Sequence, residues 1–135
     1  MDSVSKGVPM NVTTSLKERA VSFLELAASG RVDQAYADYV GDGFLHHNPY
    51  FSGDAASLKA AMAENAAQNP RKTLEVKRSL EDGDLVAVHS HVRQKPEDPG
   101  AAVVHLFRFE KGRIVELWDL GQPVMDEGPN EHGMF

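Results

Sequence analysis

The sequence predicts an α+β fold, with helices first and an antiparallel sheet after them. Up to about residue 68, apolar residues recur at the spacing of three and four that is typical of helices. After Pro70 the period changes to two, and apolar residues alternate with polar ones as far as residue 121. Helices gathered before a run of antiparallel strands indicate a helical layer on one face of a sheet. The 135 residues suit a single domain.

Three helices are expected in the first half, over residues 14–29, about 32–40 and about 54–68. The first begins near Ser15, which stands three residues before Glu18, as in a capping box. Gly30 supplies its C-terminal stop. Residues 41–43, with two glycines, break the pattern after the second helix, and Pro70 closes the third. Glycine and proline signals therefore separate the three helices.

Four strands are expected in the second half, over residues 74–81, 85–93, 103–109 and 113–121. Asp82 and Gly83 form a hairpin turn signal between the first two strands. Residues 95–100, with two prolines, indicate a loop before the third strand. A last hairpin turn is expected near Gly112, so the four strands follow one another as an antiparallel meander.

The turn of the last hairpin decides which residues of its strands face each other. A two-residue loop would give Lys111 an unfavourable positive φ, so we favour a three-residue loop over residues 110–112 with its glycine in the left-handed conformation. In that register His105 faces Leu117, and Asp119 is a diagonal neighbour. One mostly apolar face then carries Val103, His105, Phe107, Val115, Leu117 and Asp119.

Composition excludes several classes of protein. Fourteen Lys and Arg against twenty Asp and Glu give a net charge of −6, which argues against nucleic acid as a partner. The absence of cysteine excludes disulfides, thiolate catalysis and Cys-based zinc sites. No apolar run is long enough for a membrane span, and the first nine residues lack the apolar segment of a secretory signal. We therefore expect a cytoplasmic protein that does not bind membranes.

His105 and Asp119 are the candidate catalytic pair. A carboxylate beside an imidazole on an apolar face can acquire a raised pKa or orient the imidazole for proton transfer. Each residue alone also permits a plainer interpretation, as a strand aspartate in water and as a core histidine bonded to backbone. Their joint placement favours the functional interpretation.

The remaining histidines fall into two local groups. His89 and His91 stand two apart on a strand and share a face, so a metal could bind them, although a structural or solvent-facing role is favoured for at least one. His46 and His47 begin a His-His-Asn-Pro segment between large apolar residues. Polar side chains in such a setting indicate the rim of a pocket, and Asn-Pro is also an ordinary turn opener.

Several stretches in this order resemble a known family. They are GFLHHNPYFSGD, EDGDLVAVHSHV, VVHLFRFEKGRIVELWDLGQPV and NEHGMF. The chain resembles the nuclear transport factor 2-like superfamily and, within it, the SnoaL-like polyketide cyclases. The resemblance implies a cone-shaped α+β barrel over residues 13–135, in which helices pack on a curved, mostly antiparallel sheet around an internal cavity. It also implies a flexible N-terminus over residues 1–12 and assembly as a homodimer.

The resemblance also assigns roles to residues. SnoaL-like cyclases close a polyketide ring by intramolecular aldol condensation without metal or cofactor. Their acid/base aspartate matches Asp119, and an assisting histidine matches His105. Many members carry Gln where this chain has His46, which leaves the role of that position open. The side chains expected to bind substrate are His46, His47, Asn48, Tyr50, His89, Phe107 and Leu117.

Three functions follow as hypotheses. The first is a cofactor-free acid/base enzyme of the SnoaL-like type, which performs an aldol condensation or a related isomerase or lyase step on a small apolar carbonyl compound. The second is a binding protein of the same fold that holds a small apolar ligand without chemistry. The third is a metal-dependent enzyme built on His89, His91 and His105. The first is favoured, so neither a metal nor a cofactor is expected.

Overall fold

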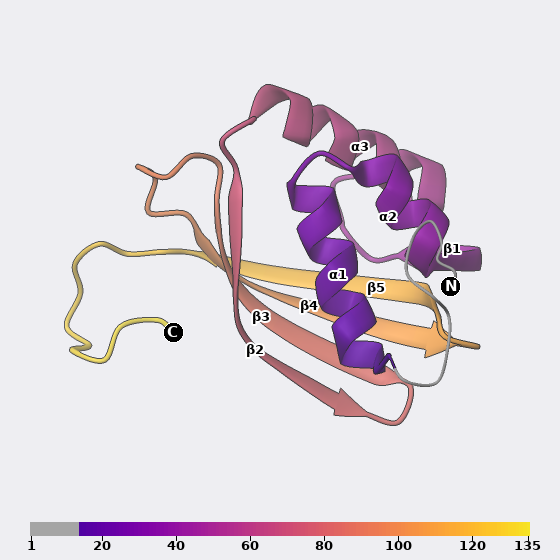
Figure 1. Ribbon diagram of the computed structural model, residues 1–135. Helices are drawn as coiled ribbons and strands as arrows, with labels where there is room; N and C mark the ends of the chain where they lie inside the picture. Colours follow the sequence, from indigo (N-terminus) through magenta and orange to yellow (C-terminus); the bar gives the residue numbers. More distant parts are fainter. Residues whose placement is uncertain (1–13) are drawn as a thin grey trace.

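The computed structural model describes residues 14–135 (Figure 1). The flexible segment expected over residues 1–12 lies outside them. The elements in chain order are α1 (Leu16–Ala28), α2 (Val32–Tyr39), β1 (Val40–His46), α3 (Ala55–Gln68), β2 (Thr73–Asp82), β3 (Leu85–Arg93), β4 (Ala101–Glu110) and β5 (Arg113–Pro123).

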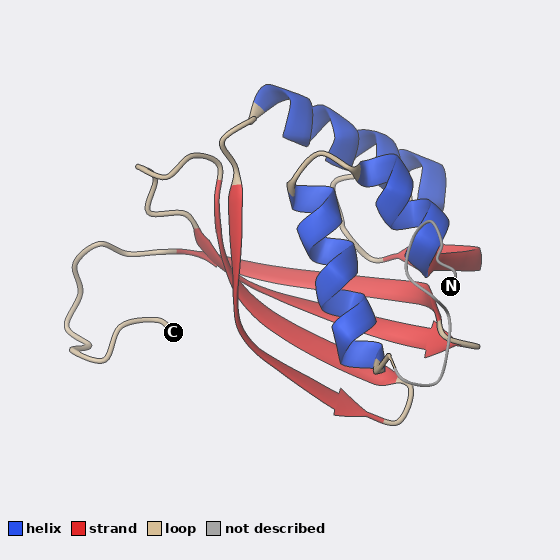
Figure 2. Ribbon diagram, in the orientation of Figure 1, coloured by secondary structure: helices blue, strands red, loops and turns tan. Residues whose placement is uncertain are grey.

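All five strands form one curved sheet in the order β1-β5-β4-β3-β2. Neighbouring strands are antiparallel, except that β1 runs parallel to β5. Figure 2 shows the three helices on one face of the sheet, which we call the inner face; the opposite face is the outer face. The predicted α+β class is confirmed. The sheet does not close into a complete barrel, because β1 and β2 are its two edges.

Local signals set the helix ends as the sequence predicts. Oγ of Ser15 accepts a hydrogen bond from the backbone N–H of Glu18 at 3.1 Å, and the Ser15 N–H donates to Oε1 of Glu18 at 2.8 Å. Gly30 follows the end of α1 with a φ of 91°. Asp54 caps α3 by accepting from the N–H of Ser57 at 3.0 Å. No helix of residues 14–135 is long and apolar enough to cross a membrane.

Strand β1 is absent from the sequence prediction, which places a break at residues 41–43. The glycines serve the strand instead. A Cβ at Gly41 would lie 3.0 Å from Cβ of Arg113 and 3.3 Å from Cγ1 of Val115, so a glycine lets β1 approach β5 closely. Gly43 has a φ of 75° and lies in the irregular stretch between Val40 and Leu45. These pairings join segments that are far apart in the chain, so the local spacing of apolar residues does not predict the strand.

The prediction of a three-residue loop between β4 and β5 is wrong. Lys111 and Gly112 form a two-residue turn with φ of 52° and 78°, and Glu110 pairs with Arg113. Positive φ at both central residues is the requirement of a type I′ turn, whose twist matches that of a hairpin. That match outweighs the unfavourable conformation of Lys111.

A bulge in β5 then restores a shared face. Phe109 pairs with Ile114, but Arg108 pairs with Glu116, so Val115 is an extra residue. Ile114 therefore joins the inner-face core in place of the predicted Val115. Beyond the bulge, His105 lies directly opposite Asp119, a closer pairing than the predicted diagonal one.

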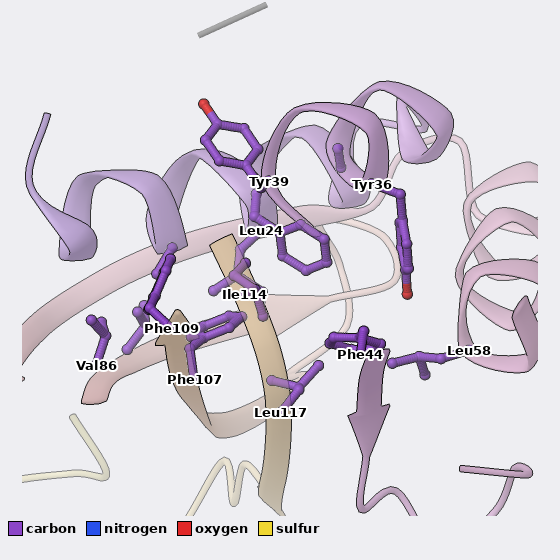
Figure 3. Packing of buried hydrophobic residues seen from close by; sticks show 14 of the residues in the cluster. Leu24, Tyr36, Tyr39, Phe44, Leu58, Val86, Phe107, Phe109, Ile114 and Leu117 are labelled. Atoms are coloured by element: carbon purple, nitrogen blue, oxygen red, sulfur yellow. The ribbon is translucent and has the colours of Figure 1, made fainter. Parts of the chain in front are cut away.

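An aromatic core fills the space between the helices and β3, β4 and β5. The ring of Phe23 lies 5.5 Å from that of Tyr36 and 5.9 Å from that of Phe107, and Tyr36 lies 6.1 Å from Phe44. Figure 3 shows Tyr36 and Phe44 on one side of this cluster and Phe107 and Phe109 on the other. Burying each large apolar side chain contributes roughly 1.5–3 kcal/mol. This core holds the strands that carry the site.

Candidate active site

A cavity of about 210 Å³ lies between the inner face of the sheet and the helices α1 and α3. It is larger than the roughly 150 Å³ that accommodates benzene in an engineered cavity. The volume therefore suits a compound of about one ring. Its lining residues are Leu24, Ala27, Ala28, Met62, Lys72, Leu74, Val92, Val103, His105 and Asp119.

His105 and Asp119 meet at this cavity. They lie directly opposite each other on β4 and β5, so their side chains leave the same face of the sheet. Val88, the partner of His105 on β3, is fully buried in the inner-face core. The walls of the cavity are thus mostly apolar. Three polar groups lie among them: the imidazole of His105, the carboxylate of Asp119 and the ammonium of Lys72.

Burial keeps the His105 imidazole neutral. It lowers the pKa of His105 to about 4, while the Asp119 carboxylate acts in the opposite direction and the positive charge of Lys72 acts in the same direction as burial. The ring borders the cavity, yet its Nδ1 is buried and has no hydrogen-bond partner. Near neutral pH this side chain offers one N–H donor and one acceptor nitrogen.

Asn48 orients the carboxylate of Asp119. Its Nδ2 donates to Oδ2 of Asp119 at 3.0 Å, and its own Oδ1 accepts from the backbone N–H of Tyr50 at 2.9 Å. The backbone bond fixes which end of the amide faces the carboxylate. Asn48, expected to bind substrate, is thus a positioning residue for Asp119.

His46 supports the same loop from within. Its buried ring donates from Nε2 to the carbonyl of Ser52 at 2.6 Å, and its Nδ1 accepts from the N–H of Asn48 at 3.1 Å. It also stacks on Phe44, with 6.5 Å between ring centroids. Both ring nitrogens are therefore engaged by backbone, and His46 does not line the cavity.

His47 and Tyr50 lie away from the cavity. His47 is on the outer face, where Nε2 donates to Oε2 of Glu116 at 2.7 Å and the ring stacks on Trp118 at 4.9 Å. Tyr50 is 83% exposed in the loop after β1. Alternation along the chain sends His47 outward and Asn48 inward, so the predicted pocket rim divides between the two faces.

His89 and His91 also point to the outer face. His91 donates from Nε2 to the carbonyl of Pro99 at 2.7 Å and stacks on Phe135 at 4.5 Å. His89 is hydrogen-bonded to Arg78. His105 is on the inner face, so the triplet of the metal hypothesis does not come together. Among residues 14–135, no group of three or more His, Asp or Glu side chains is placed to hold a metal ion.

Phe107 and Leu117 lie beneath the site rather than in its lining. They pair with each other across β4 and β5, both are buried, and both belong to the aromatic core. The ring of Phe107 stacks on that of His105 at 6.1 Å. They therefore form the floor that holds the His105 ring.

Lys72 is a cavity residue that is absent from the sequence predictions. Its Nζ donates to Oδ1 of Asn65 at 2.7 Å, and burial lowers its pKa. A local signal existed, because Lys72 stands two residues before Leu74, an inner-face residue of the predicted strand. The period of two, extended by one step, would have placed the ammonium on the cavity face.

The family model described as "SnoaL-like domain" matches residues 20–117 of this chain. That match covers more than half of the chain, and it contains every element from α2 to β4 completely. No curated protein matches the sequence.

Solved structures share the fold at low sequence identity. An NTF-2 like protein of unknown function from Burkholderia xenovorans LB400 has a TM-score of 0.68 and 17% identity, over 84% of this chain and 88% of the other. A candidate hydroxylase, AclR from Streptomyces galilaeus, has a TM-score of 0.62 and 24% identity, over 81% of each chain. A candidate polyketide cyclase from Acidithiobacillus ferrooxidans has a TM-score of 0.62 and 19% identity, over 83% of this chain and 91% of the other.

Proposed function

The chain belongs to the SnoaL-like domain family of the NTF2-like superfamily, and from this membership and the cavity we propose that it is a cofactor-free acid/base enzyme. Its substrate is a small, mostly apolar carbonyl compound. The reaction is an intramolecular aldol condensation of the polyketide-cyclase type or a related isomerase or lyase step. The observation that carries the proposal is the cross-strand pair of His105 and Asp119 at an apolar cavity.

Asp119 acts as the base in this proposal. Its carboxylate takes a proton from the carbon next to a carbonyl and leaves an enolate. Oδ2 already accepts from Asn48, which leaves the other carboxylate oxygen for the substrate. In the aldol case, the enolate carbon attacks a second carbonyl of the same molecule to form the ring bond. The resulting alkoxide recovers the proton from Asp119.

His105 acts as a neutral hydrogen-bond donor in the proposal. An imidazole with a pKa of about 4 carries no charge near pH 7, so its N–H stabilises the developing enolate oxygen without giving up a proton first. The Phe107 ring beneath keeps the imidazole in place. Desolvation by the apolar walls strengthens this donor–oxyanion interaction.

Exchange of α-protons tests the proton abstraction directly. Acetophenone, a one-ring ketone, is incubated with the protein in D₂O, and loss of its methyl signal is followed by proton NMR. Asp119→Asn should slow the catalysed exchange at least about a hundredfold, because general-base catalysis contributes about 10²–10⁴-fold. Asp126→Asn, in the exposed C-terminal tail, is the matched control.

Two results would decide against the enzyme. Exchange at the same rate in wild type and in folded Asp119→Asn would remove Asp119 from the chemistry. Binding of acetophenone without any catalysed exchange would favour the second hypothesis, a binding protein of the same fold.

We also propose a homodimer formed through the outer face. Leu80, Leu85 and Leu120 alternate with inner-face residues and are 66%, 46% and 59% exposed. Exposed apolar side chains on a sheet face are typical of an interaction surface. Light scattering should give twice the mass of the chain for the wild type and the monomer mass for Leu120→Glu. A monomeric wild type at micromolar concentration would contradict the dimer.

A further inference from the structure

Lys72 brings a positive charge to an otherwise apolar part of the cavity. It follows α3 and precedes β2, so it reaches the cavity from the β2 side of the sheet, while Asp119 reaches it from β5. The Lys72 N–H donates to the carbonyl of Asn69 at 3.0 Å, and Asn69 donates back to Asn65 at 2.9 Å. The turn after α3 therefore fixes the stem of the lysine in a defined position.

The ammonium has an amide partner but no carboxylate partner. Nζ donates one of its three protons to Oδ1 of Asn65 at 2.7 Å. Within residues 14–135, no ion pair joins Lys72 to Asp or Glu, whereas Lys59 and Lys77 each pair with a carboxylate. A half-buried cation is costly when no anion compensates it. Its remaining protons suit an anionic oxygen in the cavity.

We propose that Lys72 anchors the anionic group of the substrate, so that the preferred substrate is a one-ring carbonyl compound that carries a carboxylate. This assignment deepens the proposed function and rests on it for the carbonyl. The carboxylate pairs with Nζ of Lys72, and the ring lies against Leu24, Met62 and Val92. The carbonyl end then faces His105 and Asp119. The anchor lies across the sheet from the base, so it orients the substrate without touching the carbon that loses its proton.

The cavity volume limits the ligand. At about 210 Å³ it holds one ring and a small substituent. Burial lowers the pKa of Lys72 because it disfavours the charged amine, and a bound carboxylate reverses that effect. Binding of an anion should therefore weaken in alkaline solution as the amine loses its proton.

Benzoate and benzamide test the anchor. They have nearly the same shape, and only benzoate is charged. Titration calorimetry on the whole chain should show that wild type binds benzoate at least about tenfold more tightly than benzamide, as expected for a partly buried charge pair. Lys72→Met should remove this preference, because it should weaken binding of benzoate much more than binding of benzamide.

Two further variants control for charge and for folding. Lys95→Met removes the same charge from an exposed loop and should keep the preference for benzoate. Lys72→Arg keeps the charge and should retain at least part of the preference. In Lys72→Met, NMR titration should also show a higher pKa for the His105 imidazole, because a neighbouring positive charge is gone.

The outcomes separate this proposal from the enzyme proposal. Equal affinity of wild type for benzoate and benzamide would overturn the anchor, as would an unchanged preference in Lys72→Met. If the anchor fails while Asp119→Asn still abolishes α-proton exchange, the enzyme proposal stands alone. If benzoate binding depends on Lys72 but Asp119→Asn leaves exchange unchanged, the anion site stands and the chemistry fails.

Discussion

His105, on the inner face of the sheet, differs from the outer-face histidines His47 and His91. On the outer face, His47 is paired with Glu116, and His91 donates to the carbonyl of Pro99; an aromatic ring covers each of them. On the inner face, His105 borders a cavity, and its Nδ1 has no hydrogen-bond partner. A histidine with its partners in place is part of the scaffold. A histidine whose ring lines a cavity, as that of His105 does, can contact a ligand there.

The two faces of the sheet also differ in how deeply their apolar side chains are buried. The inner face packs its large side chains into one aromatic core, whereas the outer face leaves Leu80 and Leu120 more than half exposed. The stability of the fold and the proposed catalytic activity should therefore both depend on the inner face. The outer face should tolerate substitution in the monomer and matter for assembly.

Replacing a core residue should have the largest effect. Phe107 is fully buried against Phe23, so Phe107→Ala should lower the free energy of unfolding by about 3–5 kcal/mol. Leu120→Ala, on the outer face, should change it by less than about 0.5 kcal/mol. Urea denaturation at a concentration at which the chain is monomeric measures both. Equal losses would show that the two faces do not differ in this way.

Acid should destabilise the protein through His105. The pKa of this side chain is about 4 in the folded chain and 6.5 when unperturbed, so the unfolded chain takes up the proton first. The contribution of His105 to the free energy of unfolding is complete above about pH 6.5 and is lost as the pH falls toward 4. The loss amounts to roughly 3 kcal/mol at most. Urea denaturation at a series of pH values measures it.

A pair of variants isolates that contribution. His105→Gln should flatten the stability profile between pH 6.5 and 4. His132→Gln, in the exposed tail, should leave the profile unchanged. A wild-type slope retained in His105→Gln would assign the acid sensitivity to other groups.

Neighbouring loop residues should separate the faces in an activity assay. Asn48→Ala removes the donor that orients Asp119, and we expect about a hundredfold slower α-proton exchange. His47→Ala removes only outer-face contacts with Glu116 and Trp118, and exchange should persist at the wild-type rate. A similar loss in both variants would mean that the loop acts through its folding alone.

The parts of the fold that depend on local patterns could be predicted from sequence. The capping box at Ser15 and the hairpin at Gly83 each rest on a few neighbouring residues. Strand β1 and the bulge at Val115 could not be predicted, because both depend on pairing between segments far apart in the chain. The errors in the turn and in the bulge offset each other enough to keep His105 and Asp119 on one face.

The candidate site could be predicted only in part for a related reason. Residue type identified His47 and His89 as candidate site residues, but type does not reveal which face of the sheet a side chain leaves. That depends on strand register, since a shift by one residue turns a side chain to the other face. Lys72 was missed because it lies just before the strand pattern begins, in the turn after α3.

Replacing Phe135 should have a small effect on stability, and it tests whether the outer face is separate from the cavity. The ring of Phe135 stacks on His91 at 4.5 Å, and Nζ of Lys77 lies 5.1 Å from its centroid. Phe135→Ala should lower the unfolding free energy by about 0.5–1.5 kcal/mol, the usual contribution of such ring contacts. The loss should shrink when His91→Ala is already present, because the stacking partner is then gone. Exchange of α-protons should not change, since β3 separates this ring from the cavity; a slower exchange would mean that the tail acts on the site.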